Sequence, residues 1–201
     1  MNFFNRQFNR VIDANDMQAA VELLENGFIF ADRILGATIN LKRAENLEKF
    51  CRMPIEHLDA PFTRIYEIAE ASFKLDVRFF DALPPSETEM RRLIREYVDG
   101  MHGVYVCRYK GEVIGFCEVV DAAEGEAFVR FAAVDEKFRR TGAAMSIYAD
   151  VFKTYRELGY KKILGRISSR NMSALNVWRE LGAIFSNPED VYLRVKNSCT
   201  Q

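Results

Sequence analysis

The chain has 201 residues and a mass of 23.2 kDa, enough for one large domain, with or without an appendage, and too little for two full domains. Its 28 Lys and Arg residues nearly balance its 29 Asp and Glu residues, so no overall field attracts nucleic acid or an anionic membrane. Any anion-binding site must therefore be local.

Cysteine usage and the N-terminal sequence favour a cytoplasmic protein. The four cysteines form no C-x-x-C pair, and with only two histidines to help them we expect free thiols and no bound metal. The first residues contain no apolar signal region, and no stretch approaches the roughly 18 apolar residues that a membrane span needs. Nucleic acid and membranes are therefore not expected as partners.

The N-terminal part reads as a helix followed by a strand. Helical spacing of apolar residues predicts a helix over 16–26, which ends at Gly27. The stretch 28–41 is rich in Ile and Phe and is expected as a strand pair or one long strand. A polar connector with two prolines follows, so we place a soft boundary near residue 57. Residues 1–56 then form an appendage, and residues 57–201 the main domain.

The main domain alternates between helical and strand periods. Helices are expected over 62–73, 87–98, 143–158 and 172–181, and strands over 103–109, 112–121, 126–134, 161–167 and 190–195. Ser86 and Glu89 form a capping box, and Lys110–Gly111 marks a hairpin turn. This order predicts an α/β or α+β domain, a mixed sheet with helices on both faces that is suited to a small-molecule site.

The sequence contains one internal echo. Residues 17–30, shifted by 155 positions onto 172–185, match at six of fourteen positions, and both copies read as helix, glycine, strand. Any amphipathic helix that ends at a glycine before a strand would look similar. Alternatively, the N-terminal segment is the remnant of a second copy of the C-terminal half.

The stretch "RRTGAA" at residues 139–144 stands directly before the amphipathic helix over 143–158. A helix N-terminus exposes unpaired N–H groups, and small residues there leave an anion free to approach them. Two arginines add charge-assisted hydrogen bonds. An exposed loop with solvated arginines would show the same residues, but its position between an apolar strand and a helix favours a pyrophosphate cradle.

Two motifs at suitable spacing resemble the GCN5-related N-acetyltransferases (GNAT) over about residues 57 to 195. The matching residues are Val134, Arg139, Gly142 and Ala144 in the first motif, and Asn171, Ala174, Trp178 and Gly182 in the second. The resemblance implies a GNAT fold and acetyl-CoA as cosubstrate. It implies a cofactor site made of Ala133, Val134, Arg139, Arg140, Thr141, Gly142, Ala143, Ala144, Asn171 and Trp178, with the backbone N–H groups near Ala133 and Val134 at the thioester.

Trp178 is the most consequential departure from the family pattern, because many members carry there a tyrosine thought to protonate the departing thiolate. An indole N–H is far too weak an acid for that role, so we consider Tyr148 and Ser173 as substitutes. Trp178 itself fits a core residue or a flank of the cofactor. Asn171 likewise fits a helix cap, a cofactor contact, or both.

Acetyl transfer to an amine needs a group that accepts the proton of the amine. Glu118 is our choice for the catalytic base, since the resemblance places its strand beside the acetyl site. Its rivals are Asp121, Glu126 and Asp135. An acidic residue on a half-buried strand also commonly faces solvent or pairs with an arginine, and a chain of waters could carry the proton instead.

The acceptor is suggested by a looser resemblance. The appendage, the text "FKLDVRFFDALPP" and the terminal "VYLRV" resemble bacterial amino-sugar-nucleotide N-acetyltransferases such as those acting on dTDP-fucosamine. Arg78, Arg91, Arg92 and Arg95 could bind its diphosphate or form an ordinary solvated helix face. Another small amine, a peptide N-terminus or a non-catalytic acetyl-CoA-binding role are the alternatives, and a second copy of the chain is a candidate partner.

Overall fold

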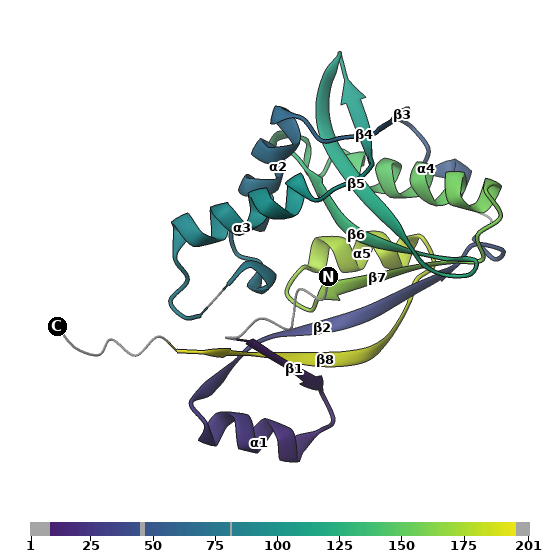
Figure 1. The fold of residues 1–201 in the computed structure, drawn as a ribbon. Coiled ribbons are helices and arrows are strands. Elements are labelled where there is room, and N and C mark those ends of the chain that lie inside the picture. Colours follow the sequence, from purple (N-terminus) through teal and green to yellow (C-terminus); the bar gives the residue numbers. More distant parts are fainter. Residues whose placement is uncertain (1–8, 45–46, 81, 196–201) are drawn as a thin grey trace.

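The structure is a computed structural model, which describes residues 9–44, 47–80 and 82–195. Eight strands form one mixed sheet in the order β1-β8-β2-β7-β6-β5-β4-β3 (Figure 1). The strands are β1 (Asn9–Asp13), β2 (Phe28–Asn40), β3 (Ile55–Leu58), β4 (Val104–Tyr109), β5 (Glu112–Ala123), β6 (Glu126–Val134), β7 (Lys162–Ser168) and β8 (Ile184–Arg194). Only β6 and β7 pair in parallel; the other named pairs are antiparallel.

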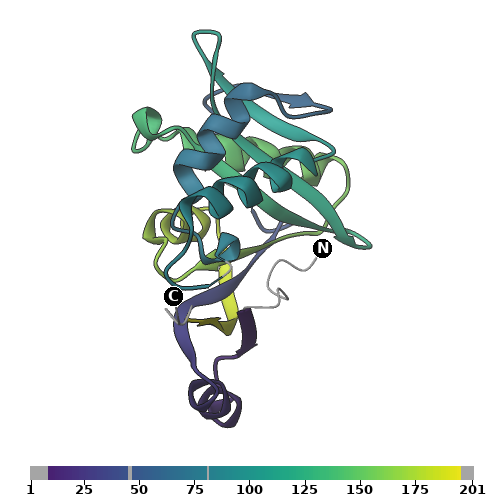
Figure 2. The same cartoon turned by 60° about the vertical axis from the view of Figure 1, so that its left-hand side comes forward.

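Helices cover both faces of the sheet, as the sequence predicts. Helices α2 (Thr63–Phe73) and α3 (Glu87–Asp99) pack on one face around the buried Phe116 and Phe131. Helices α4 (Ala143–Glu157) and α5 (Met172–Glu180) pack on the opposite face (Figure 1). Helix α1 (Met17–Glu25) has no buried residue and projects from the end of the molecule (Figure 2).

Short 3-10 helices complete the chain: η1 (Leu47–Lys49), η2 (Val77–Phe79) and η3 (Glu136–Phe138). A third, smaller core lies beneath the segment between α2 and α3. There Val77, Phe80 and Met90 pack against residues of β2 and β8. The α2–α3 segment is thereby held over β2 and β8.

Most predicted elements are confirmed within one or two residues, including the hairpin at Lys110–Gly111, where both residues have positive φ. Ser86 caps α3 through a 3.3 Å hydrogen bond from the backbone N–H of Glu89. Residues 28–40 form one long strand, which settles the choice left open by the sequence. The sequence missed β1, β3 and the first half of β8, because short or polar strands gain their stability from pairing rather than from their own pattern.

The N-terminal segment is built into the sheet rather than attached beside it. Strand β2 lies between β7 and β8 and pairs with both. The two strands of the unit β1-α1-β2 are therefore separated by β8, and the two strands of the unit β7-α5-β8 are separated by β2. The proposed boundary near residue 57 falls in β3, which pairs with β4. The division into two domains stays a prediction.

The two interlocked units match in detail at the offset of 155 residues. Helices α1 and α5 begin and end 155 positions apart. Asn9 of β1 pairs with Leu193 of β8. At the same offset Asn9 corresponds to Leu164 and Leu193 to Thr38, and these two residues pair as well. The long-range hydrogen bond from Ala14 N–H to Pro188 O has its equivalent in the bond from Ser169 N–H to Arg33 O. The echo in the sequence thus coincides with a repeated backbone arrangement.

Candidate functional site

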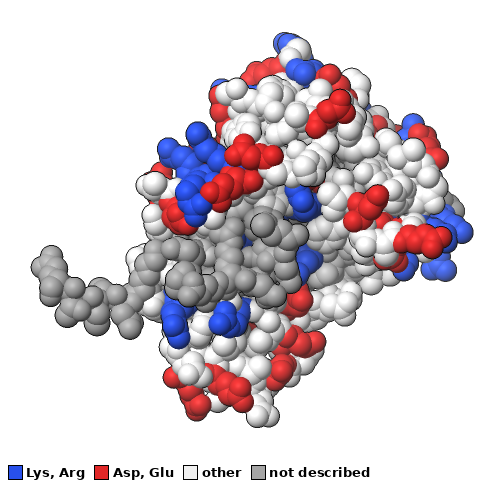
Figure 3. All heavy atoms as spheres, viewed as in Figure 1, with Lys and Arg blue, Asp and Glu red and all other residues white. Residues whose placement is uncertain are grey.

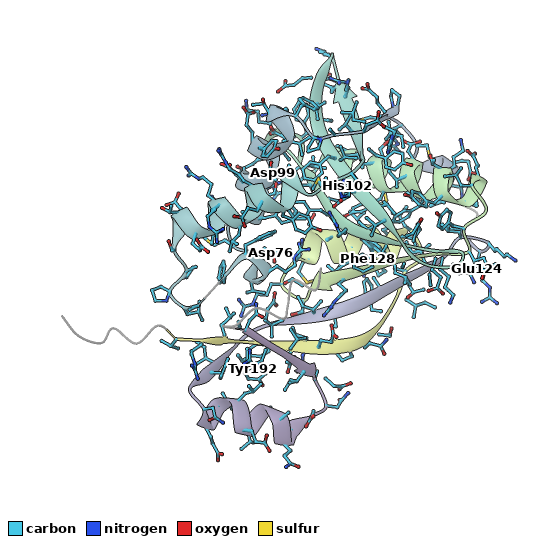
Figure 4. The ribbon with its side chains drawn as sticks, in the orientation of Figure 1. Asp76, Asp99, His102, Glu124, Phe128 and Tyr192 are labelled. Atoms are coloured by element: carbon cyan, nitrogen blue, oxygen red, sulfur yellow. The ribbon has the colours of Figure 1, made fainter. Side chains whose placement is uncertain are left out.

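The parallel pair β6–β7 opens partway along its length. The two strands pair at only three positions, the last of which joins Phe128 to Leu164. Beyond that point β6 continues to Val134 on its β5 side and β7 continues to Ser168 on its β2 side, with no pairing between them. Phe128, labelled in Figure 4, marks where the opening begins. The sheet therefore presents unpaired strand edges in its middle, as the resemblance implies near Ala133 and Val134.

The loop after β6 forms a cradle of backbone N–H groups. Within the described residues, the N–H groups of Arg140, Gly142, Ala143, Ala144 and Met145 have no hydrogen-bond acceptor. Arg140 (φ 69°) and Gly142 (φ 87°) are both left-handed, and such turns aim successive N–H groups at one point. A hypothetical Cβ on Gly142 would meet no atom within 4 Å, so the approach is open. This arrangement at a helix N-terminus suits an anion.

Side chains of the cradle fix its shape and leave charge exposed. The Thr141 hydroxyl donates to Phe138 O at 2.7 Å. Arg139 donates to the Ser72 hydroxyl at 3.2 Å and, through a longer 3.4 Å contact, to Val134 O. The positive φ of Arg140 is a strained conformation for a residue with a side chain, and glycine would adopt it without that strain.

Glu118 lies in the buried part of β5, on the face covered by α2 and α3, with only 1% of its surface exposed. Arg130 of β6 binds both carboxylate oxygens, at 2.5 and 2.9 Å. A bulge in the β5–β6 pairing at this level gives Arg130 no cross-strand partner of its own. Burial raises the pKa of Glu118 above its ordinary value, and the charge of Arg130 opposes that rise.

The three rival carboxylates are engaged away from the opening. Asp121 accepts a hydrogen bond from Tyr160 near the far end of β5, and Glu126 pairs with Lys162 at 2.7 Å. Asp135 caps η3 and binds Arg64. Glu118 is the candidate whose cross-strand partner, Phe131, lies in the open stretch of β6, while Asp135 directly follows the end of that strand. Arg130 itself was missed by the sequence analysis, although the hairpin turn at residues 124–125 could have placed it within one residue of the position opposite Glu118.

Trp178 is a core residue, because it is 1% exposed and lies on β7 directly over Gly165. A Cβ on Gly165 would stand 2.5 Å from the indole ring, so the glycine makes room for the tryptophan. The ring of Tyr148 meets the indole edge-on at 5.7 Å between centroids. Burial raises the pKa of Tyr148, and both Trp178 and Arg78 act against that rise.

Tyr148 lies near the strand opening, because its ring packs on Trp178, and Trp178 stands over Gly165 just beyond the last β6–β7 pair. Tyr148 belongs to α4, on one face of the sheet, and Arg78 lies in η2, on the other. Ser173, the other substitute considered for the missing tyrosine, is exposed on the first turn of α5.

Asn171 acts as the N-cap of α5, since its side chain accepts a hydrogen bond from Ala174 N–H at 3.1 Å. This confirms the capping interpretation, while a contact with the cofactor stays a prediction. The arginines of α3 behave as an ordinary solvated face, as basic and acidic side chains alternate over this helix (Figure 3). They form ion pairs with glutamates of α2 and α3.

Cys51, Cys107 and Cys117 are free thiols, and Cys199 lies outside the described residues. Across the described ranges, no group of three or more His, Cys, Asp or Glu side chains is arranged to hold a metal ion. In the same part of the chain, no helix has the length and apolar character needed to cross a membrane.

Comparison with known proteins identifies a family. The model described as the acetyltransferase (GNAT) family matches residues 62–183, which is more than half of the chain. Among curated proteins, none matches the chain.

Several solved structures share the fold. A conserved protein of unknown function from Staphylococcus epidermidis is 12% identical with a TM-score of 0.67, and the match covers 93% of this chain and 72% of that one. A GCN5-related N-acetyltransferase from Sphaerobacter thermophilus is 17% identical with a TM-score of 0.58, covering 92% and 58%. The GCN5-related glucosamine N-acetyltransferase region of a fungal multi-domain β-N-acetylglucosaminidase is 12% identical with a TM-score of 0.58, covering 90% and 24%. At these identities the likeness extends to the fold alone.

Proposed function

Because the chain belongs to the GNAT family of acetyltransferases, we propose that it transfers an acetyl group from acetyl-CoA directly to the amine of a nucleotide-linked amino sugar. Acetyl-CoA is the cosubstrate of this family, and the chain is an acyltransferase on that ground. The acceptor and the roles of individual residues are the proposed part.

The observation that carries the proposal is the set of five backbone N–H groups without acceptors at the start of α4. Such groups bind phosphate oxygens without a reorganisation cost, because the loop geometry already holds them in place. The diphosphate of CoA fits this chemistry, and Arg139 and Arg140 add charge at the rim. The open edge of β6 next to the loop offers further backbone groups to the pantetheine arm.

Glu118 is proposed to accept the proton that the acceptor ammonium must lose before its nitrogen forms the new C–N bond. Burial raises the pKa of this carboxyl group toward the range in which a base is effective at neutral pH. Arg130 holds both oxygens and so fixes the orientation of the carboxylate. The proton passes to Glu118 directly or through water.

Tyr148 is proposed to protonate the thiolate that leaves when the C–S bond breaks. The phenol is protonated at neutral pH, since the ordinary pKa of tyrosine is 10.0 and burial raises it, although the same rise makes Tyr148 a weaker acid than an exposed tyrosine. The indole of Trp178 packs against the phenol ring and limits its orientation. In this arrangement Trp178 orients Tyr148, the proposed acid, and does so from the position where many members of the family carry a tyrosine.

The amino-sugar acceptor is supported by the looser resemblance in sequence and by one fold relative, whose name describes a glucosamine N-acetyltransferase region. A direct test supplies acetyl-CoA and measures thiol release with three classes of amine: a 4-amino-4-deoxyhexose on a nucleoside diphosphate, polyamines, and peptides with free N-termini. We expect release only with the first class. Thiol release only with polyamines or peptides would show that the acceptor is an amine of that class and not an amino-sugar nucleotide. Stabilisation by acetyl-CoA without release from any amine would favour a non-catalytic binding role.

A further inference from the structure

Arg78 reaches the strand opening from the face covered by α2 and α3. It extends from η2, and its Nη1 contacts the backbone oxygen of Arg130 on β6 at 3.4 Å. Its guanidinium lies 5.6 Å from the ring centroids of both Phe73 and Phe131. Asp76, labelled in Figure 4, binds the Nε and Nη2 side of the same group. The acid partner therefore holds Arg78 from one side, and Nη1 is directed toward β6.

Arg166 stands on the other side of the same opening. It belongs to the stretch of β7 beyond the last β6 pairing, and its neighbours Gly165 and Ile167 face the α4–α5 side. The side chain of Arg166 therefore points to the same face as Arg78. Glu189 of β8 forms an ion pair with it. The position next to Arg166 on β2 is Gly36, where a Cβ would stand 3.0 Å from the backbone oxygen of Ser186, so β8 approaches β2 closely here.

The two guanidinium groups thus belong to residues at opposite sides of the opening, Arg78 at β6 and Arg166 on β7. Burial and the positive charge of Arg78 both lower the pKa of Arg166. Each side chain nevertheless keeps part of its surface exposed, 22% for Arg78 and 28% for Arg166. Each arginine is paired with one carboxylate, Asp76 or Glu189, and a phosphoryl group in the opening would lie between the two guanidinium groups.

We propose that Arg78 and Arg166 together bind a phosphoryl group of the acceptor, on the opposite face of the sheet from α4. This subsite rests on the proposed acetyl transfer to a nucleotide-linked amino sugar. Arginine suits it, because a planar guanidinium binds phosphate oxygens through two hydrogen bonds. Arg78 is one of the four arginines that the sequence offered for this role, and the other three, on α3, are paired on an exposed helix surface.

The test separates this subsite from the cradle at α4. CoA is added to saturation so that the cradle is filled, and inorganic pyrophosphate is then titrated by calorimetry into the wild type, Arg166→Gln and Arg179→Gln. Arg179 is the matched control, since it lies on exposed α5 and pairs with the adjacent Glu180. We expect pyrophosphate binding to weaken at least tenfold in Arg166→Gln and to stay unchanged in Arg179→Gln. Arg166→Lys, which keeps the charge, is expected to lose less.

CoA affinity of each variant reports whether the fold is intact, and Arg166→Lys replaces Arg166→Gln if the latter does not fold. Absence of pyrophosphate binding, or equal binding in the wild type and the tested Arg166 variant, overturns the subsite. Pyrophosphate binding that depends on Arg166 supports the subsite. If such binding is found but no amino-sugar nucleotide is acetylated, the proposed acceptor is rejected while the anion subsite is retained.

A separate observation carries a second inference, about the N-terminal segment. Residues 9–39 and 164–194 share helix bounds, strand register and loop hydrogen bonds at one constant offset. The two helix caps agree as well, because Asp16 accepts from Ala19 N–H as Asn171 accepts from Ala174 N–H. Chance similarity of two amphipathic helices does not explain a matching register in two different strand pairs.

We infer that the N-terminal segment is a second copy of the C-terminal β-α-β unit, and that the two copies complete one another within a single folding unit. A protease site placed in the connector after β2 and cut in the folded protein tests this. The two fragments are expected to co-elute in gel filtration and to separate only in denaturant. Release of the N-terminal fragment under native conditions, with CoA binding retained by the remainder, contradicts the inference.

Discussion

Gly142→Asp provides the sharpest test of the cradle, because the chain contains a matched control in Gly159. Both glycines are exposed and left-handed, with φ of 87° and 90°, and neither has an atom within 4 Å of a hypothetical Cβ. They stand at opposite ends of α4. A side chain costs each position about 1–2 kcal/mol of backbone strain. For a chain of this size, that lowers Tm by roughly 2–8 °C in both variants.

Binding of CoA should separate the two variants. A carboxylate at about 5 Å from a phosphate charge is repelled by roughly 1–3 kcal/mol for an effective dielectric constant between water and a protein surface. The Kd for CoA is then expected to rise by about 5- to 150-fold in Gly142→Asp. Gly159→Asp, at the far end of the helix, should keep the wild-type Kd.

Calorimetric titration of CoA and thermal unfolding are the two measurements. The repulsion should weaken as salt is added, because the cradle is exposed to solvent. Equal CoA affinity in the two variants, with both folded, would refute the assignment of the N–H cradle to the diphosphate. An equal loss of affinity in both variants would point to a general loss of stability and would refute it too.

Three further predictions follow from the geometry of single residues. Arg140→Gly should raise Tm by a few degrees, because glycine adopts φ 69° without strain, and should weaken CoA binding if the guanidinium contacts the diphosphate. Gly165→Ala should cost about 1–3 kcal/mol in unfolding free energy, measured by denaturant titration, because the new Cβ overlaps Trp178; an unchanged midpoint would contradict the packing. The rate of acetyl transfer should fall as the pH drops through the pKa of Glu118, which burial raises above the ordinary glutamate value. Glu118→Gln should lose most activity, and its remaining activity should no longer show this fall at low pH. If the fall persists in the variant, another group is responsible for it.

The raised pKa of Glu118 also has a consequence for stability. A carboxyl group whose native pKa exceeds its unfolded pKa binds its proton more tightly in the native state. Its contribution is therefore largest below the unfolded value and declines as the pH rises through the native value. Comparing the pH dependence of Tm in the wild type and Glu118→Gln measures this term, and parallel curves would contradict it.

The sequence by itself determined the parts of this protein that depend on local order. The hairpin at Lys110–Gly111, the cap at Ser86 and the helix after Gly142 follow from turn chemistry, capping and period, and each lies where it was predicted. The anion cradle is equally local, because a left-handed glycine before a helix suffices to present N–H groups. The internal similarity at an offset of 155 residues was also visible in the sequence, but the sequence did not distinguish a chance similarity of two helices from a second copy.

The tertiary structure alone decided which distant residues meet. Arg78 and Arg166 come from separate elements, and nothing in the sequence indicates that both face the opening between β6 and β7. The place of β2 between β7 and β8 is likewise a matter of pairing over long range, which depends on register and not on the strand's own residues. Trp178 became interpretable only when Gly165 was seen beneath it. A local pattern determines single helices and strands because it acts over a few residues, whereas a site assembled from residues of β5, β6, β7, η2, α4 and α5 depends on tertiary packing.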